Sequence, residues 1–199
     1  MPDVASPAAS SAGEPTVRAY QPSDRQAARQ LLTSAFGRAA VAELAEELRG
    51  SSAHRAAVVA DAPAAAADAP AGSALAGLVQ LSRGWLDAPA RLLDVLVLSP
   101  LGVQPELQGR GIGGALVRAA IDTAHQLAAP LLFLEGSPRY HPRFGFRPGG
   151  QHGFLRPSTR IPEPAFQVIM LPGWQPWMVG ALVYPDAFWR HDSVGLRDR

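Results

Sequence analysis

The 199-residue chain contains no cysteine and no lysine. Without cysteine the chain can form neither a disulfide framework nor a thiolate metal site, and it has no cysteine to carry an acyl group. All 18 basic side chains are therefore arginine, and with 17 acidic residues the formal net charge is only +1. A balance this close to neutral gives no electrostatic reason to expect a nucleic-acid or membrane partner.

The chain also lacks segments that would direct it into a membrane. Its first residues are not a basic stretch followed by an apolar core, so no secretory signal is predicted. No apolar run is long enough to span a bilayer, and we expect a cytoplasmic protein. Composition predicts a disordered tail over residues 1–15, rich in Ala, Ser and Pro, one folded domain over 16–188 and a C-terminal tail over 189–199.

Apolar periodicity and turn signals predict a mixed α/β domain with a largely antiparallel sheet. Residues 84–87 are expected to turn between two strands, and residues 61–72, rich in Ala, Pro and Asp, to form a long loop. Strands are expected near residues 16–20, 56–60, 73–81, 92–103, 130–135, 166–171 and 181–184, and helices near 22–35, 41–48 and 111–127, with one helical turn at 138–143.

The most informative segment is residues 101–117, where an apolar run is followed by a short polar turn, four glycines and an amphipathic helix pattern. Glycine lets ligand atoms approach the backbone N–H groups closely. The N–H groups at a helix N-terminus are unsatisfied and lie at the positive end of the helix dipole. The segment therefore predicts an anion site, most naturally for phosphate.

Two common phosphate-binding motifs fit this segment poorly. Residues 109–114 match G-x-G-x-x-G, and Glu135 follows at the distance expected of a dinucleotide-binding enzyme. However, residues 104–108 separate the first glycine from its strand, whereas in that motif the two are adjacent. A nucleotide-binding P-loop requires a lysine after the glycines, and this chain has none. A nicotinamide-dependent enzyme is kept as an alternative.

Three blocks of sequence resemble the GNAT acetyltransferase superfamily. Residues 108–113 read Q-G-R-G-I-G and resemble its Q-x-x-G-x-G acyl-CoA signature. Residues 140–146 read Y-H-P-R-F-G-F and resemble the Y-x-R/K-F-G-F segment after the family's fifth strand. Residues 165–188 look like the C-terminal part of a bacterial branch of uncharacterised N-acetyltransferases. The resemblance covers residues 16–188.

The resemblance implies an α/β (α+β) GNAT-like fold with a mixed, largely antiparallel central sheet, flanking helices and an acyl-CoA cleft between strands 4 and 5. It implies acetyl-CoA as co-substrate, no metal, and direct transfer of acetyl to a primary amine in a ternary complex. We expect a small-molecule acceptor, and a homodimer is compatible with the sequence. The cofactor-binding residues implied are Leu101, Val103, Gln108, Gly109, Arg110, Gly111, Ile112, Gly113, Gly114 and Arg143, although Arg143 could instead cap the short helix.

The catalytic groups remain open between alternatives. Some relatives place a general-base glutamate at the position of Val97, and valine cannot take a proton. Others use a tyrosine at the position of His141, so either His141 or its neighbour Tyr140 is the proton donor, or both only pack or bond near the CoA arm. Tyr140 is favoured, because a phenol keeps its proton at the pH values where an alkyl amine begins to lose its own.

Further positions leave other readings open. Glu135 ends the predicted fifth strand, where it would bind or orient the amine or simply be solvated. The departures at Val97 and His141 keep open a catalytically reduced module that binds acyl-CoA as a sensor. The aromatic C-terminal segment, with Trp174, Trp177, Phe188 and Trp189, predicts a core contribution, a substrate wall or a dimer contact.

Overall fold

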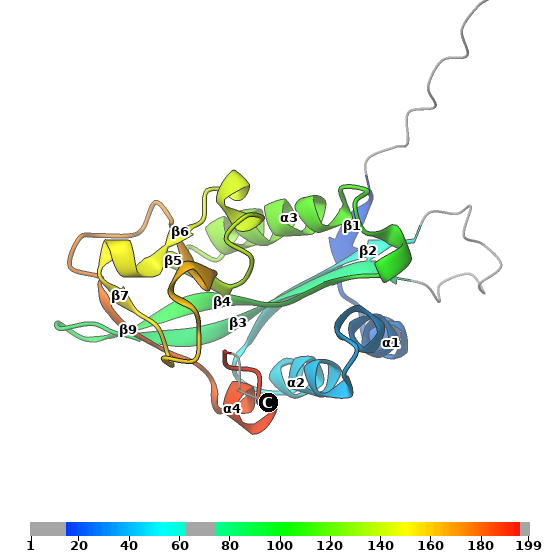
Figure 1. Ribbon diagram of the computed structural model, residues 1–199, viewed down its shortest axis with the longest axis horizontal. Coiled ribbons are helices and arrows are strands. Elements are labelled where there is room, and N and C mark those ends of the chain that lie inside the picture. The colour runs from blue at the N-terminus through cyan, green and yellow to red at the C-terminus, as the bar shows by residue number, and fades with distance from the viewer. Residues whose placement is uncertain (1–14, 63–74, 196–199) are drawn as a thin grey trace, which may run out of the picture.

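The structure is a computed structural model that describes residues 15–62 and 75–195 (Figure 1). The predicted N-terminal tail, except for Pro15, and the predicted loop beyond Ala62 lie outside the described residues. The helices are α1 (Arg25–Phe36), α2 (Ala39–Arg49), α3 (Ile112–Gln126) and α4 (Asp186–Arg190). The strands are β1 (Val17–Ala19), β2 (His54–Asp61), β3 (Leu75–Asp87), β4 (Leu92–Val103), β5 (Leu131–Glu135), β6 (Arg147–Pro148), β7 (Phe154–Leu155), β8 (Phe166–Met170) and β9 (Gly180–Val183). Short 3₁₀ turns occupy Pro22–Asp24, Pro105–Leu107, His141–Phe144, Gly149–His152 and Glu163–Ala165.

The strands form one sheet in the order β1-β2-β3-β4-β5-β8-β6. Neighbours in this order are antiparallel except β4 and β5, which are parallel and are connected through α3. β9 pairs with the last residues of β3, and β7 runs parallel to β9. The predicted mixed, largely antiparallel sheet with a parallel crossover at the glycine helix is confirmed.

Helices cover both faces of the sheet. Figure 1 shows α3 on one face and α1, α2 and α4 on the other. The buried positions of α3 include Leu116 and Ala120, four residues apart and therefore on one side of the helix, where they pack on the sheet. On the opposite face Leu44 and Leu48 of α2 repeat this spacing and contact the cluster around Phe133 of β5. Burying each such leucine contributes about 1.5–3 kcal/mol of hydrophobic stabilisation.

The sheet opens between β4 and β5. Their pairing is limited to Leu96 with Leu132 and Val97 with Phe133. Further along, β4 follows β3, while β5 pairs with β8 on its other side. The β3–β4 register also shifts by one residue between the pairs Val79–Leu101 and Leu81–Leu98. The edge of β4 beyond Val97 therefore faces a cleft instead of a partner strand.

Two glycines let helices approach this part of the sheet. A Cβ on Gly77 would lie 2.7 Å from Leu116 of α3, and one on Gly102 would lie 3.0 Å from Leu32 of α1. Gly102 pairs with Leu78, the neighbour of Gly77, so the two close contacts lie on opposite faces of the same part of the sheet. A larger side chain at Gly102 would push α1 away from β4, and one at Gly77 would push α3 away from β3.

The structure corrects the predicted turn at residues 84–87. β3 continues through these residues, since Trp85 pairs with Asp94 of β4 and with Val183 of β9. The connection to β4 instead uses residues 88–91. Gly84 meets a packing need, because a Cβ there would lie 3.0 Å from Val97.

The predicted C-terminal tail from residue 189 is packed as far as the structure describes it. α4 extends to Arg190, and Val194 is buried. Arg38 Nη2 donates to the carbonyl oxygens of His191 and Asp192, at 3.3 and 3.1 Å. These contacts fix the segment against the loop between α1 and α2. Of the aromatic residues, Phe188 lies in the core, Trp174 and Trp177 pack against it, and Trp189 is exposed.

Candidate active site

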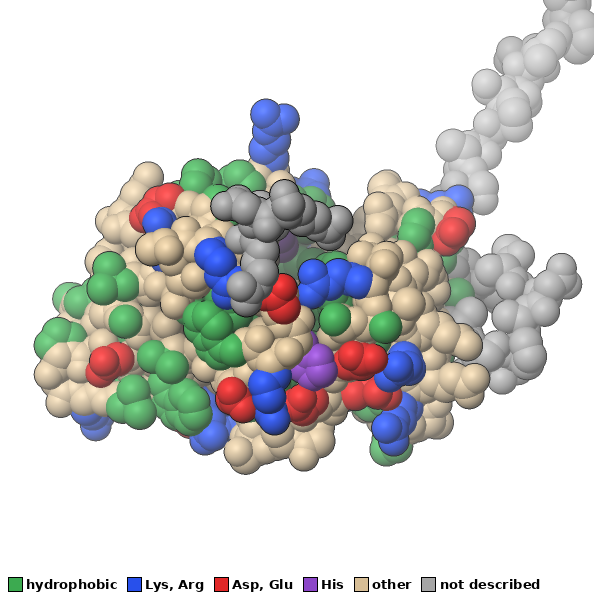
Figure 2. Space-filling view, turned by 60° about the horizontal axis from the view of Figure 1, so that its bottom comes forward, with side chains coloured by type: hydrophobic (Ala, Val, Ile, Leu, Met, Phe, Trp, Pro, Cys, Tyr) green, Lys and Arg blue, Asp and Glu red, His purple; other side chains and the backbone are tan. Residues whose placement is uncertain are grey.

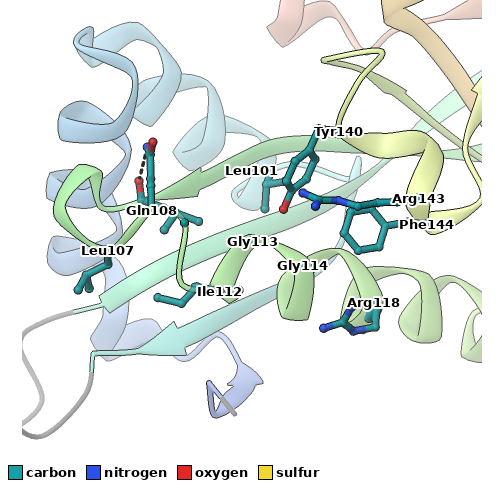
Figure 3. Close-up of a pocket in the computed structure, with 13 residues that line it drawn as sticks. Leu101, Leu107, Gln108, Ile112, Gly113, Gly114, Arg118, Tyr140, Arg143 and Phe144 are labelled. Carbon is teal, nitrogen blue, oxygen red and sulfur yellow. Dashed lines mark hydrogen bonds between the residues drawn. The ribbon is translucent and has the colours of Figure 1, made fainter. Parts of the chain in front are cut away.

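A cavity of about 600 Å³ lies where β4 diverges from β5, beside the start of α3 (Figure 3). Its walls come from the end of β4, the glycine loop, the first turns of α3 and the short helix after β5. It is lined by Leu101, Val103, Leu107, Gln108, Gly109, Gly111, Ile112, Gly113, Gly114, Arg118, Tyr140, Arg143 and Phe144. The structure thus brings together every residue predicted to hold the cofactor except Arg110, which is exposed and outside the lining. We call this the glycine-loop cavity.

The glycine-loop cavity has the features of an anion site. Gly111 caps α3 in the left-handed conformation, with φ of 85°, and no side chain caps the helix. The first intrahelical bond is from Ala115 N–H to Gly111, which leaves the preceding N–H groups without helical partners. Arg118 and Arg143 add positive charge, and none of the described lining residues is acidic.

Gly113 lies opposite Tyr140 at the glycine-loop cavity, where a side chain would have little room. Tyr140 Oη lies 2.6 Å from the position that a Cβ on Gly113 would occupy. Figure 3 shows the Tyr140 phenol directed toward the start of α3, with Arg143 beside it. The Arg143 guanidinium lies 4.0 Å from the centre of the Tyr140 ring, a cation–π distance that holds both side chains at the cavity.

Gln108 has a local structural role. Its Nε2 donates to the carbonyl oxygen of Val103 at 3.2 Å, shown as the dashed line in Figure 3. This bond ties the glycine loop back to the end of β4. The left-handed φ values of Gly109 and Gly111, 76° and 85°, then direct the chain into α3.

A second cavity, of about 370 Å³, lies on the other side of Leu101. The α1–α2 loop, the bulged part of β4, the end of β5 and residues 192–195 form its walls. It is lined by Phe36, Arg38, Val41, Leu44, Leu98, Ser99, Pro100, Leu101, Leu134, Glu135, Gly136, His141, Asp192, Ser193 and Gly195. We call this the carboxylate cavity, after Glu135.

The two candidate proton donors face different cavities. Tyr140 lines the glycine-loop cavity and His141 lines the carboxylate cavity. Their ring centroids are 5.0 Å apart, with the planes at 80°. Together with Leu101, which lines both cavities, this pair marks the boundary across which a group could pass from one ligand to another.

Burial perturbs two titratable groups of the carboxylate cavity, His141 and Glu135. Burial, and to a smaller extent the charge of Arg143, lowers the pKa of His141 from 6.5 to about 4. The imidazole is therefore neutral at physiological pH, and its Nδ1 is buried without a hydrogen-bond partner. Burial raises the pKa of Glu135, although the N–H of Gly195 donates to its Oε2 at 3.2 Å.

The buried imidazole makes stability depend on pH in a defined direction. Below pH 6.5 the unfolded chain binds a proton at His141, whereas the folded chain binds this proton only when the pH falls to about 4. Stability is therefore lost as the pH falls through this window, by up to about 3 kcal/mol. Urea unfolding at pH 7 and pH 4.5 should show a smaller loss for His141→Gln than for wild type. Equal losses in the two proteins would contradict the assignment.

Sequence reasoning missed several lining residues. Arg118 lies one helical turn after Gly114, so the helix period alone could have placed it at the glycine-loop cavity. Phe36, Arg38 and residues 192–195 reach the carboxylate cavity through tertiary packing, for which no sequence motif exists.

In the described part of the chain, no helix is both long and apolar enough to cross a bilayer.

Comparisons with known proteins agree with this geometry. Residues 60–146 match the sequence profile of the acetyltransferase (GNAT) family. The uncharacterized N-acetyltransferase YjhQ of Escherichia coli (strain K12) is 32% identical over 146 residues, covering 71% of this chain and 74% of that protein.

Solved structures share the fold. A GNAT family N-acetyltransferase, YhbS, from Escherichia coli in complex with CoA aligns with a TM-score of 0.77 at 24% identity, covering 92% of this chain and 96% of that one. A GNAT family acetyltransferase from Brucella melitensis in complex with acetyl-CoA aligns with a TM-score of 0.67 at 23% identity, covering 88% and 98%.

Proposed function

The chain belongs to the GNAT family of acetyltransferases, and from this premise we propose that it transfers acetyl from acetyl-CoA to the primary amine of a small molecule by direct attack in a ternary complex. The observation that carries the proposal is the meeting of two cavities at Leu101 and the Tyr140–His141 pair. One cavity is suited to an anionic cofactor, and the other presents a carboxylate to a cation. Acetyl-CoA supplies an acetyl group already activated as a thioester.

The glycine-loop cavity fits the cofactor. The free N–H groups at residues 112–114, with Arg118 and Arg143, would hold the pyrophosphate. The open edge of β4 at Leu101 and Val103 would bind the extended pantetheine arm through backbone groups. The missing Cβ of Gly113 keeps space between α3 and Tyr140. Arg110, which is outside the cavity lining, is left without a role in this arrangement.

Tyr140 is proposed as the proton donor. Its hydroxyl faces the cofactor side of the boundary, where the thiolate leaves, and it can donate the Oη proton to that sulfur. His141 is on the acceptor side and is neutral above about pH 4, so it has no extra proton to give at neutral pH. A lining role for His141, without acid catalysis, is the simpler assignment.

Glu135 is proposed to bind the acceptor. Its carboxylate lines the second cavity together with Leu101 and His141, so an ammonium bound to it would lie in the same cavity as these boundary residues. Because burial raises the pKa of Glu135, the group is also a better proton acceptor than an exposed carboxylate. It thus replaces, from β5, a function that Val97 on β4 cannot supply.

The surface favours a small acceptor over a polycationic one. Figure 2 shows acidic and basic side chains mixed across the face that carries α2 and α4. Several are paired: Arg190 with Glu47 and with Asp186, and His191 with Glu47. Among the described residues of this face, charges paired in this way do not form an acidic patch for a basic protein segment.

The alternatives make different predictions. A sensor that binds acyl-CoA without catalysis would release no thiol with any amine. A nicotinamide-dependent enzyme would be stabilised thermally by NAD and not by CoA. The experiment is a thiol-release assay with acetyl-CoA and a panel of amines, followed by mass spectrometry of the products. Thiol release that requires an amine, with formation of its N-acetyl derivative, supports the proposed function.

Direct transfer predicts that no acetyl group resides on the protein. The chain has no cysteine, so the most common thioester-accepting nucleophile is absent. Intact-mass spectrometry after mixing with acetyl-CoA alone should show the unmodified mass. A stoichiometric adduct that is discharged by the amine would contradict direct attack.

A further inference from the structure

The residues that line the carboxylate cavity restrict the chemical class of the acceptor amine. Seven apolar side chains contribute to the walls of this cavity of about 370 Å³, beside its polar groups: Phe36, Val41, Leu44, Leu98, Pro100, Leu101 and Leu134. A cavity of this size admits a small molecule. The apolar part of this lining matches an apolar body, because a charged or polar group buried against it would lose water without gaining a partner.

Two of the three charged groups that line the cavity are already engaged. Asp192 forms an ion pair with Arg160, at 3.5 Å. Arg38 donates to the carbonyl oxygens of residues 191 and 192. Glu135 is held by one backbone bond, from Gly195 to its Oε2. Of the three, Glu135 is the group placed to meet a ligand charge.

We propose that the acceptor is a monoamine with an apolar body, aryl or branched alkyl, whose ammonium group binds Glu135. The inference rests on the proposed function and specifies its substrate class. A polyamine would bring a second ammonium into a cavity whose other carboxylate, Asp192, is already paired with Arg160, so this ammonium would lose water without gaining a new partner. An α-amino acid whose ammonium group binds Glu135 would bring its own carboxylate next to the carboxylate of Glu135. The two negative charges would repel each other.

The first test compares matched amines with wild-type protein at saturating acetyl-CoA. 2-Phenylethylamine, phenylalanine, phenylalanine methyl ester and spermidine are assayed for thiol release. We expect kcat/KM for 2-phenylethylamine to exceed that for phenylalanine and spermidine by about 100-fold or more, since each of these two amines carries an additional charge that finds no partner in the cavity. The methyl ester, which lacks the carboxylate charge, should recover most of the loss.

The second test locates the binding site by calorimetry. 2-Phenylethylamine is titrated into CoA-loaded protein, a readout that does not depend on turnover. Glu135→Gln keeps an oxygen for the bond from Gly195 but removes the charge, and it should weaken binding about 10-fold. Phe36→Ala should weaken the binding of 2-phenylethylamine but leave the binding of ethylamine unchanged. Leu127→Ala is the matched control, because Leu127 is 45% exposed against 43% for Phe36 and lies outside the cavity.

The outcomes separate this inference from the proposed function. Acetylation of spermidine or phenylalanine as efficient as that of 2-phenylethylamine overturns the substrate class and leaves acetyl transfer intact. An unchanged affinity for 2-phenylethylamine in both Glu135→Gln and Phe36→Ala would show that the amine does not bind in the carboxylate cavity. Absence of thiol release with every amine overturns the proposed function itself, and with it the inference.

Discussion

Replacing Tyr140 with phenylalanine is expected to lower kcat by about 10²- to 10⁴-fold while acetyl-CoA binding stays nearly unchanged. The substitution removes one oxygen and keeps the ring that Arg143 covers at 4.0 Å, so the cavity wall is preserved. An interaction that matters mainly in the transition state affects turnover more than ground-state binding. Steady-state kinetics with 2-phenylethylamine, together with calorimetry of acetyl-CoA, separates the two quantities.

Two further variants make the Tyr140 result specific. Tyr20→Phe deletes the same oxygen outside both cavities and should leave kcat unchanged. If His141→Gln shows the large loss of kcat while Tyr140→Phe turns over normally, the imidazole is the acid and the assignment is wrong. Normal turnover in both would leave positioning and backbone polarisation as the sources of rate.

Replacing Gly113 with valine is expected to weaken acetyl-CoA binding by about 10- to 100-fold, which corresponds to losing one hydrogen bond to a charged group. A Cβ at this position would lie 2.6 Å from Tyr140 Oη, and the branched side chain would project into the cavity. Gly173→Val is the matched control, since the nearest atom to a Cβ there is 3.8 Å away. Unchanged affinity in a folded Gly113→Val protein would contradict the glycine-loop site.

The sequence predicted the features that depend on local chemistry. The glycine run and the apolar spacing of α3 depend on neighbouring residues, and the structure places both where the patterns indicated. The resemblance of residues 140–146 likewise placed Tyr140 and Arg143 at the same cavity as the glycines. What the motifs did not indicate is that Tyr140 and His141 face different cavities, because that depends on the path of the short helix after β5.

The errors have identifiable causes. Gly84 followed by an aspartate three residues later looked like a turn, but Leu86 is fully buried and pairs on both sides, so packing extended the strand. The charged, polar composition of residues 189–199 indicated a tail. The buried Val194 and the bonds from Arg38 fix the described part of that segment, and these long-range contacts have no local signature.

The central claim is that this chain moves acetyl from acetyl-CoA to a primary amine, and the most direct measurement follows that group. Wild-type protein is incubated with acetyl-CoA labelled with ¹³C in the acetyl group and with 2-phenylethylamine, and the products are analysed by mass spectrometry. The account predicts that labelled N-acetyl-2-phenylethylamine and free CoA form in equal amounts. In Tyr140→Phe the rate of their formation should fall by about 10²- to 10⁴-fold. Binding of acetyl-CoA without a labelled amide from this or any other amine would contradict it.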